Sequence, residues 1–353
     1  MRASVIVVNY NGGEEAAESV ASLAAMAKGC GAEIIVVDND SNDGSDRLIH
    51  EAAPEARLLR EERNLGYARA VNRGLSDARG DALVILNPDV RPLEGALAGL
   101  VRAVLDGTEP CLIGGVMIGR NGRVTYDTAR PLPVLSDILR EGLFLPGRRL
   151  ASRTELLRRL GDDRVVFAPA ISGAAMALHK KTLSTLGPMD GDYFLYNEDV
   201  EWCRRALRLG VSVGVAASCV FGHGGGASTR KTERTAFAAR VLSDFIYFCE
   251  GEGAAPEIVS RLWSQRLLFR TWLYRADARC AILGGRPSSR ERAAIYQELR
   301  RRLRAFEWTP EISVQSGHPS RLLGATWRPT DRGSRRSGDG AERSGRNPER
   351  AAE

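Results

Sequence analysis

The stretch VILNPDVRP, Val84–Pro92, decides the fold and poses the first question about the site. An apolar run ends here in Asn87-Pro88-Asp89. Pro88 fixes φ near about −65° and has no N–H, so a strand stops there and the chain turns at the end of a sheet. Asp89 is thereby presented at that edge. A carboxylate with open coordination positions suits Mg²⁺ or Mn²⁺, yet Asn-Pro-Asp is also a good turn, and alone the motif favours the turn.

Three similar apolar runs precede this one, and a helical pattern separates each from the next. They are SVIVVNY (4–10), EIIVVDND (33–40) and ARLLRE (56–61). Strands that are apolar throughout, rather than alternating, are buried on both faces. The order strand–helix, repeated, therefore predicts an α/β fold with a doubly wound, mostly parallel central sheet.

Ligands of such sheets bind beyond the carboxyl ends of the strands. Small polar or acidic residues follow every apolar run, namely Tyr10-Asn11, Asp38-Asn39-Asp40, Asn64 and Asn87-Pro88-Asp89. Asp38-Asn39-Asp40 reads as Asp-x-Asp, a pattern that suggests a metal site. Its place after the second strand fits nucleoside recognition better, so it is not the predicted metal site.

Glu198-Asp199 lies within YFLYNEDVEW, at the expected start of a helix that Gly210 ends. Two carboxylates there are favoured by the helix dipole, so helix capping is one explanation. Between aromatic side chains a carboxylate would be partly desolvated, which raises its pKa toward that of a useful general base. On local evidence, catalysis and capping are about equally supported.

His223 closes the apolar run VSVGVAASCVFGH and precedes three glycines and a Ser-Thr pair. A lone histidine is more often a core or surface residue than a ligand. The strand end, and glycines that let a phosphate approach the backbone, shift the interpretation modestly toward a metal or phosphate ligand.

The chain divides into three parts in sequence. Residues 1–230 are the expected catalytic domain, within which 120–165 are rich in Arg, Gly, Pro and Leu and predict a flexible insertion near the site. Residues 231–325 predict a helical region. Residues 326–353 are Arg, Gly, Ser and Glu, a composition that cannot bury a core, and predict a disordered tail.

Composition limits the class of protein. The net charge is +6, and residues 251–353 hold 20 arginines against 12 acidic residues. The basic bias therefore lies in the C-terminal third, and the first 250 residues are close to neutral. For this reason we expect no nucleic-acid partner. The six cysteines show no Cys-x-x-Cys pair and predict free thiols of a reducing compartment. No signal peptide or membrane span is apparent. We expect a cytoplasmic protein.

Together these motifs have a family resemblance. Tyr10-Asn11, VVDNDSNDGS, NLGYARAVNRG, LNPD, SGAAMAL and FLYNEDVEWCRRALRLG…GHGGGAST occur in this order over residues 3–230. The chain resembles the family 2 inverting glycosyltransferases of the GT-A fold, and most of all their rhamnosyltransferase-like branch. Two positions depart from the family pattern: Asn87 replaces the first Asp of Asp-x-Asp, and Glu201 stands where many relatives have Asp.

The resemblance implies the following roles. Tyr10 and Asp38 would hold the nucleotide base, Asp89 the divalent ion bridging the donor diphosphate, and His223 would lie near the metal or diphosphate. Asp199 would be the catalytic base, with Glu198 supporting it or touching the acceptor. Ser172 and Gly173 would line the floor of the site, while Asn11, Asn64 and Asn87 complete the donor-binding set.

The resemblance also implies substrates and partners. The donor would be a dTDP- or UDP-linked sugar, with rhamnose or another 6-deoxyhexose as the guess, and the acceptor a glycan, a lipid-linked glycan or a small molecule. A lipid-linked acceptor would bring the basic C-terminal third to the inner membrane face, and the C-terminal helices could also form a homo-oligomer.

Three other classes of protein fit the sequence less well. A nucleotidyltransferase would present acidic strand ends, but usually has a basic residue in its first loop, whereas VVNYNGGEEAAE is acidic. A dinucleotide-dependent oxidoreductase would need Gly-x-Gly-x-x-Gly after the first strand. A non-catalytic nucleotide-sugar-binding or scaffold protein is disfavoured by the intact Asp89, Asp199 and His223.

Overall fold

A computed structural model describes residues 2–107, 109–125, 128–142, 156–159, 162, 164–223, 233–251, 256–280 and 288–304. Its strands are β1 (Ala3–Asn9), β2 (Ala32–Asp38), β3 (Arg57–Arg60), β4 (Ala82–Leu86), β5 (Val90–Pro92), β6 (Cys111–Ile118), β7 (Ala129–Arg130), β8 (Val165–Phe167), β9 (Ala170–Ile171), β10 (Ala175–His179) and β11 (Ser212–His223). Its helices are α1 (Gly13–Cys30), α2 (Ser45–Ala52), α3 (Tyr67–Asp77), α4 (Ala96–Leu105), α5 (Leu135–Gly142), α7 (Lys180–Leu186), α8 (Glu198–Arg208), α10 (Glu233–Glu250), α11 (Pro256–Cys280) and α12 (Ser288–Arg304).

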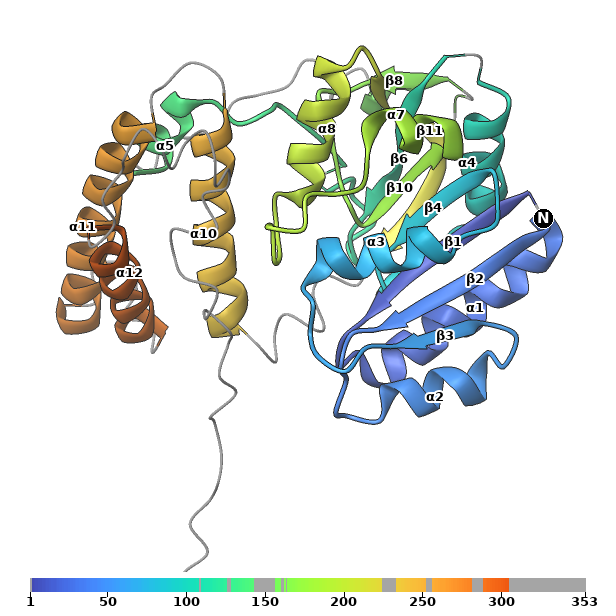
Figure 1. Ribbon diagram of the computed structural model, residues 1–353, viewed down its shortest axis with the longest axis horizontal. Coiled ribbons are helices and arrows are strands. Elements are labelled where there is room, and N and C mark those ends of the chain that lie inside the picture. The colour runs from blue at the N-terminus through green and yellow to red at the C-terminus, as the bar shows by residue number, and fades with distance from the viewer. Residues whose placement is uncertain are drawn as a thin grey trace, which may run out of the picture.

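The central sheet has the strand order β3-β2-β1-β4-β10-β6-β11-β5, with β8 pairing to β11 (Figure 1). Its first four strands are parallel, as are β6 and β11. Strand β10 is inserted antiparallel between β4 and β6, and β5 runs antiparallel to β11. The predicted α/β fold with a mostly parallel sheet is confirmed.

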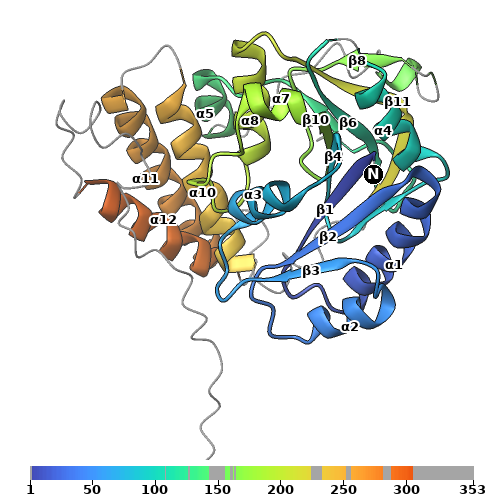
Figure 2. The same cartoon turned by 45° about the vertical axis from the view of Figure 1, so that its right-hand side comes forward.

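Both faces of the sheet are covered, as the fully apolar strands predict. All of β1 is buried, and its side chains alternate between two cores: Ile6 and Val8 enter one, Val5 and Val7 the other. Helices α3 and α8 pack on the first face and helices α1 and α4 on the second (Figure 2).

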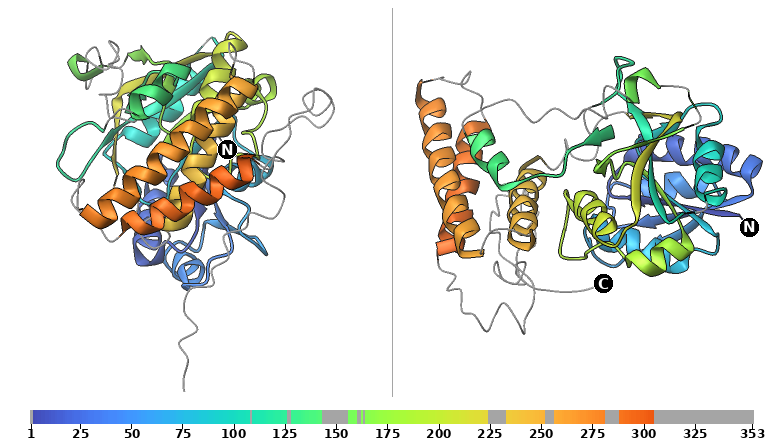
Figure 3. Two further views of the ribbon diagram at one scale, coloured as in Figure 1. Left: turned by 90° about the vertical axis from the view of Figure 1, so that its left-hand side faces the viewer. Right: turned by 90° about the horizontal axis from the view of Figure 1, so that it is seen from above.

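The C-terminal helices α10, α11 and α12 enclose a third core around Phe245, Trp263 and Tyr296 (Figure 3). Helix α5 joins them, since Leu135 packs against this core. Helix α10 is shared, because Phe245 belongs to the third core while Ile246 and Tyr247 belong to the first core. The predicted helical appendage is confirmed and is packed onto the sheet domain through α10.

The structure differs from the sequence-based expectation in two places. The apolar run ISGAAMALHK (171–180) by itself predicts one strand, but Ser172-Gly173-Ala174 interrupts it and leaves β9 and β10. Strand β6 was not predicted. The insertion 120–165 contains β7, α5 and the start of β8, while its remaining parts, like the predicted tail, fall partly or wholly outside the described residues.

Two further expectations concern the described residues alone. The cysteines at 30, 111, 203, 219 and 249 are free thiols there. None of the described helices combines the length and the apolar character needed to cross a membrane.

Candidate active site

The ends of β1 and β2 form the first part of the site. The parallel register places Asn9 beside Asp38. Asn9 Nδ2 donates to Asp38 Oδ2 at 2.8 Å and to Ser45 Oγ at 2.8 Å, and the Ser41 N–H donates to Asp38 Oδ1 at 3.0 Å. Asp38 is thus rigidly held, with lone pairs left for a ligand. Asn9 was not predicted, although a buried polar residue ending an apolar strand could have marked it.

The loops that follow these strands are fixed by left-handed residues. Asn11 has φ of 51° and Asp40 of 70°, conformations that non-glycine residues adopt rarely and mainly at functional sites. Ser41 Oγ accepts from the Asn11 N–H at 2.9 Å. Tyr10, partly buried, lies between the strand and this loop. On the neighbouring loop, Asn64 Oδ1 accepts from Asn39 Nδ2 at 3.0 Å.

Asp89 and His223 come together although they are far apart in sequence. Strand β5 follows Asp89 directly and pairs with β11, so that Val90 lies opposite His223. His223 Nε2 is 3.5 Å from Asp89 Oδ1, and the two side chains are 19% and 11% exposed. This oxygen and nitrogen pair fits Mn²⁺ or Mg²⁺, which takes its remaining ligands from phosphates and water. Within the described residues no cluster of three or more acidic, histidine or cysteine ligands forms.

Tyr67 occupies the centre of the site. Its hydroxyl lies 2.8 Å from Asn87 Oδ1 and 3.1 Å from the Gly173 carbonyl. Burial raises the pKa of Tyr67 well above its usual value, and the charges of three carboxylates, Glu198, Asp199 and Asp89, raise it further. Tyr67 therefore lies within electrostatic reach of both Asp89 and Asp199. Tyr67 belongs to the motif NLGYARAVNRG, but the sequence alone indicates no role for it.

Asp199, in the first turn of α8, is held by three donors. Its Oδ2 accepts from the Gly173 N–H at 2.9 Å and from the Arg130 guanidinium at 2.8 Å, and its Oδ1 accepts from the Val200 N–H at 2.8 Å. A Cβ on Gly173 would lie 3.1 Å from the Asp199 Cβ, so a larger residue there would press on Asp199. Buried Ser172 lies next to it, and its Oγ accepts from the Ala174 N–H. Arg130 was not predicted.

Glu198 has a different environment from its neighbour. Its side chain is 6% exposed, and among the described residues its Oε2 is buried without a hydrogen-bond partner. Burial, and then the charge of Asp199, raises the pKa of Glu198 to about 8. Two adjacent carboxyls are thus distinguished: Asp199 accepts hydrogen bonds, and Glu198 favours its protonated form at neutral pH.

The turn that leads into α8 is strained and braced by the C-terminal helices. Tyr196 and Asn197 have φ of 70° and 63°. Asn197 Nδ2 donates to Asp244 Oδ1 at 2.7 Å, and Ser243 Oγ donates to the Leu195 carbonyl at 2.8 Å, both from α10. Because α10 holds this turn, it also sets the position of the two carboxyls that follow.

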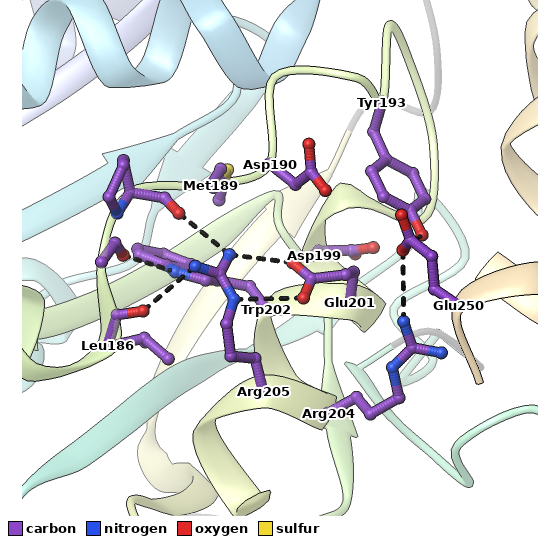
Figure 4. A network of polar contacts seen from close by, with 12 residues as sticks. Leu186, Met189, Asp190, Tyr193, Asp199, Glu201, Trp202, Arg204, Arg205 and Glu250 are labelled. Carbon is purple, nitrogen blue, oxygen red and sulfur yellow. Dashed lines mark hydrogen bonds and ion pairs between the residues drawn. The ribbon is translucent and has the colours of Figure 1, made fainter. Parts of the chain in front are cut away.

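Further contacts lock α8 itself (Figure 4). Glu250, at the end of α10, accepts from the Tyr193 hydroxyl at 2.7 Å and pairs with Arg204 at 3.4 Å. Glu201, whose role was uncertain, pairs with Arg205 at 2.9 Å, and Arg205 also donates to the Leu186 and Pro188 carbonyls. Glu201 therefore has a structural role, because its ion pair with Arg205 ties α8 to the segment from Leu186 to Pro188.

The arrangement defines a class of enzyme. The site combines polar strand ends suited to a nucleoside, an Asp–His pair suited to a metal–phosphate group, and a carboxylate held by three donors. Such a site can transfer a group from a nucleoside diphosphate to an acceptor that loses a proton.

Comparison with known proteins gives the family. The model of the family described as "Glycosyl transferase family 2" matches residues 4–167. The N-acetylglucosaminyl-diphospho-decaprenol L-rhamnosyltransferase of Mycobacterium tuberculosis is 28% identical over 264 residues, which cover 70% of this chain and 83% of that protein. Dolichol-phosphate mannosyltransferase of Pyrococcus furiosus is 26% identical over 42% of this chain and 41% of its own length. These comparisons support a family 2 glycosyltransferase: residues 4–167 match the family model, and the chain is similar to a rhamnosyltransferase over 70% of its length.

Among solved structures, the mannosyltransferase PcManGT from Pyrobaculum calidifontis, in complex with GDP-Man and Mn²⁺, is similar. It has a TM-score of 0.49 and 19% identity, covering 89% of this chain and 78% of that chain.

Proposed function

We propose that this glycosyltransferase transfers a 6-deoxyhexose such as rhamnose, with inversion, from a dTDP- or UDP-linked donor to a hydroxyl of a lipid-linked glycan. The observation that carries the proposal is that Asp199 and Asp89, which pairs with His223, both lie within electrostatic reach of Tyr67. The named activity of the Mycobacterium tuberculosis relative supports the choice of rhamnose and of a lipid diphosphate acceptor.

In the proposed reaction Asp199 takes the proton from the acceptor hydroxyl. The acceptor oxygen forms a bond to the anomeric carbon from the face opposite the leaving group. The bond from that carbon to the diphosphate oxygen breaks, and the nucleoside diphosphate leaves with the electron pair. One attack from the opposite face inverts the anomeric configuration.

The divalent metal is assigned to Asp89, with His223 as a second ligand. When bound, the ion would neutralise charge on the departing diphosphate. Asn87 replaces a second carboxylate at this edge, and its Oδ1 lies within hydrogen-bond distance of the Tyr67 hydroxyl. We assign Asn87 to the orientation of Tyr67 and of the donor, together with Asn64.

The nucleotide is assigned to the ends of β1 and β2. Tyr10 and Asn11 would contact the base and ribose from one side. Asp38, already oriented by Asn9, would accept from a donor N–H or hydroxyl with its remaining lone pairs. Ser172 and Gly173 would form the floor between donor and acceptor.

Calorimetric titration with dTDP, UDP, GDP and NAD, each in Mn²⁺ and again in EDTA, tests donor and metal together. Binding of dTDP or UDP that EDTA abolishes is expected. Binding that is indifferent to EDTA would remove the metal from the proposal, and binding of none of the four would remove the donor class. Transfer from dTDP-rhamnose to a synthetic N-acetylglucosaminyl-diphospho-lipid, followed by NMR of the new anomeric centre, tests the acceptor and the inversion.

A lipid-linked acceptor calls for contact with a bilayer surface, and α11 offers a suitable face. Its exposed residues recur every three or four positions on one side and mix apolar with basic groups. Phe269 and Trp272 stack with ring centroids 6.3 Å apart, and Trp272 is 61% exposed. Aromatic and arginine side chains together suit the interface of an anionic membrane. The face consists of Ile258, Arg261, Gln265, Leu268, Phe269, Trp272 and Arg275.

Co-sedimentation with vesicles of anionic or neutral phospholipid tests this peripheral membrane contact. We expect binding to anionic vesicles that salt weakens and that Trp272→Ala reduces. If the protein stays in solution at low salt, and ultracentrifugation shows a dimer that Trp272→Ala dissociates, then the face binds a second copy instead.

A further inference from the structure

We propose that Arg130 is the positioning residue of the catalytic base, and that the C-terminal helices act on the reaction through it. The inference rests on the proposed function, because it concerns the same carboxylate. Arg130 ends the two-residue strand β7, which pairs with β9 directly before Ser172 and Gly173. The small β7–β9 sheet thereby delivers two of the three donors that hold Asp199.

The hydrogen bonds of Asp199 leave room for a substrate. A carboxylate has about four lone-pair sites. Arg130 and the Gly173 N–H fill those of Oδ2, and the Val200 N–H takes one on Oδ1. One site on Oδ1 remains for the acceptor hydroxyl. Arg130 therefore orients the carboxylate without occupying the lone pair that would take the proton.

Arg130 also supplies charge where carboxyl groups crowd. Its side chain is 24% exposed, and its positive charge lowers the pKa of Glu198 against burial and against the charge of Asp199, which both raise it. Tyr67 and Cys203 also lie within electrostatic reach of Asp199. A guanidinium forms a charge-assisted hydrogen bond to its carboxylate partner, and such bonds are stronger than those between neutral groups. Arg130 is the basic side chain that the structure places on Asp199 within the described residues.

Both members of this ion pair lie close in sequence to residues that contact the C-terminal helices. Four residues separate Arg130 from Leu135 of α5, which packs against the core of α10, α11 and α12. Asp199 follows Asn197, which is bonded to Asp244 of α10 at 2.7 Å. The C-terminal helices carry no recognised motif, yet they can thus affect the position of Asp199. A ligand or partner that binds these helices could therefore change the geometry of the base.

The test compares Arg130→Ala and Arg130→Lys with the matched control Arg301→Ala. Arg301 is an exposed arginine of α12 that pairs with Glu298 at 2.8 Å. For Arg130→Ala we expect kcat of rhamnosyl transfer to fall about 10- to 100-fold, the effect of losing one hydrogen bond to a charged group. The Kd for the nucleoside diphosphate, measured by calorimetry, should stay unchanged. Arg130→Lys should recover part of the rate.

Chemical rescue separates positioning from mere structural support. Millimolar guanidinium ion should restore part of the transfer rate of Arg130→Ala and leave wild type and Arg301→Ala unaffected. An Arg130→Ala enzyme with wild-type kcat would overturn the inference. So would a variant with lower kcat that neither guanidinium nor lysine improves. If the wild-type protein transfers no sugar, the proposed function is wrong. The inference about Arg130 is then wrong as well, because it depends on that function.

Discussion

The donor side and the base side of the site are built in different ways. On the donor side, Asn9, Asp38 and Asp89 stand at the ends of strands that neighbour each other in one sheet. On the base side, Asp199 is held by Gly173 from the loop after β9 and by Arg130 from β7, while α10 braces the turn before it. The first side depends mainly on strand pairing, which also brings Asp89 to His223, and the second on polar contacts from loops and from α10.

This difference predicts how each side responds to change. Strand ends within a buried parallel sheet are fixed by ladder hydrogen bonds and two apolar cores, so substitutions there should affect binding locally. The base is fixed by a few polar contacts. The loss of any one of them should lower the rate of transfer and leave donor binding intact.

The largest effect is expected for Asp199→Asn, which removes the base. General-base catalysis contributes about 10²–10⁴-fold, so kcat should fall by that order while the Kd for the nucleoside diphosphate stays within error. Single-turnover transfer and calorimetry on the same preparation give both values. Asp81→Asn is the control, because Asp81 is exposed just before β4, at the opposite end of that strand. Normal transfer by Asp199→Asn would assign the base elsewhere.

The next effect belongs to the donor side. Asp89→Ala removes the carboxylate of the Asp89–His223 pair. Nucleotide binding in Mn²⁺ should weaken at least about tenfold, since even groups that only support metal ligands contribute ~10–100-fold to metal affinity. Binding in EDTA should be the same for variant and wild type. A variant that binds its donor normally in Mn²⁺ would reduce Asp89 to a turn residue.

The two sides also differ in how far the sequence predicts them. The apolar runs predict the parallel strands, and the polar residues after each run predict the donor side. His223 could be placed at a strand end, and the pairing of β5 with β11 then brings it to Asp89. Their roles as ligands stay predictions.

The base side is predicted only in part. Glu198 and Asp199 stand out because two carboxylates begin a helix among aromatic residues. Arg130 does not, because it lies in a stretch without periodicity and meets Asp199 only through the pairing of β7 with β9. The antiparallel direction of β10 cannot be predicted from the sequence either, because an apolar run does not indicate the direction of a strand within a sheet. The contact of Asp244 with Asn197 cannot be predicted from the sequence either, because only tertiary packing brings these two residues together.

A smaller effect concerns the proton on Glu198. Its pKa of about 8, against an ordinary 4.5, means that the folded protein holds this proton more tightly than the unfolded chain does. The contribution to stability is therefore present below about pH 4.5 and is lost as the pH rises toward 8. Glu198→Gln cannot titrate, so its stability relative to wild type should rise across this window, by roughly a few kcal/mol.

Thermal unfolding of wild type and Glu198→Gln between pH 5 and 8, in EDTA, measures this difference. Groups elsewhere titrate equally in both proteins and cancel. A constant difference in Tm across the range would show that Glu198 is charged in the folded protein, and the two carboxyls would then no longer be distinguished.

The smallest expected effect tests whether the C-terminal helices belong to the base side. Asp244→Ala removes the acceptor of Asn197, whose left-handed φ of 63° is costly for a non-glycine residue. Without that bond the turn before Glu198 relaxes, and we expect kcat to fall by up to about tenfold, the value of one hydrogen bond, with unchanged donor Kd. Glu298→Ala, which breaks an exposed ion pair within α12, is the matched control. Equal kcat for Asp244→Ala and Glu298→Ala would confine α10 to packing, whereas a loss seen only in Asp244→Ala extends the catalytic unit to a helix that carries no motif.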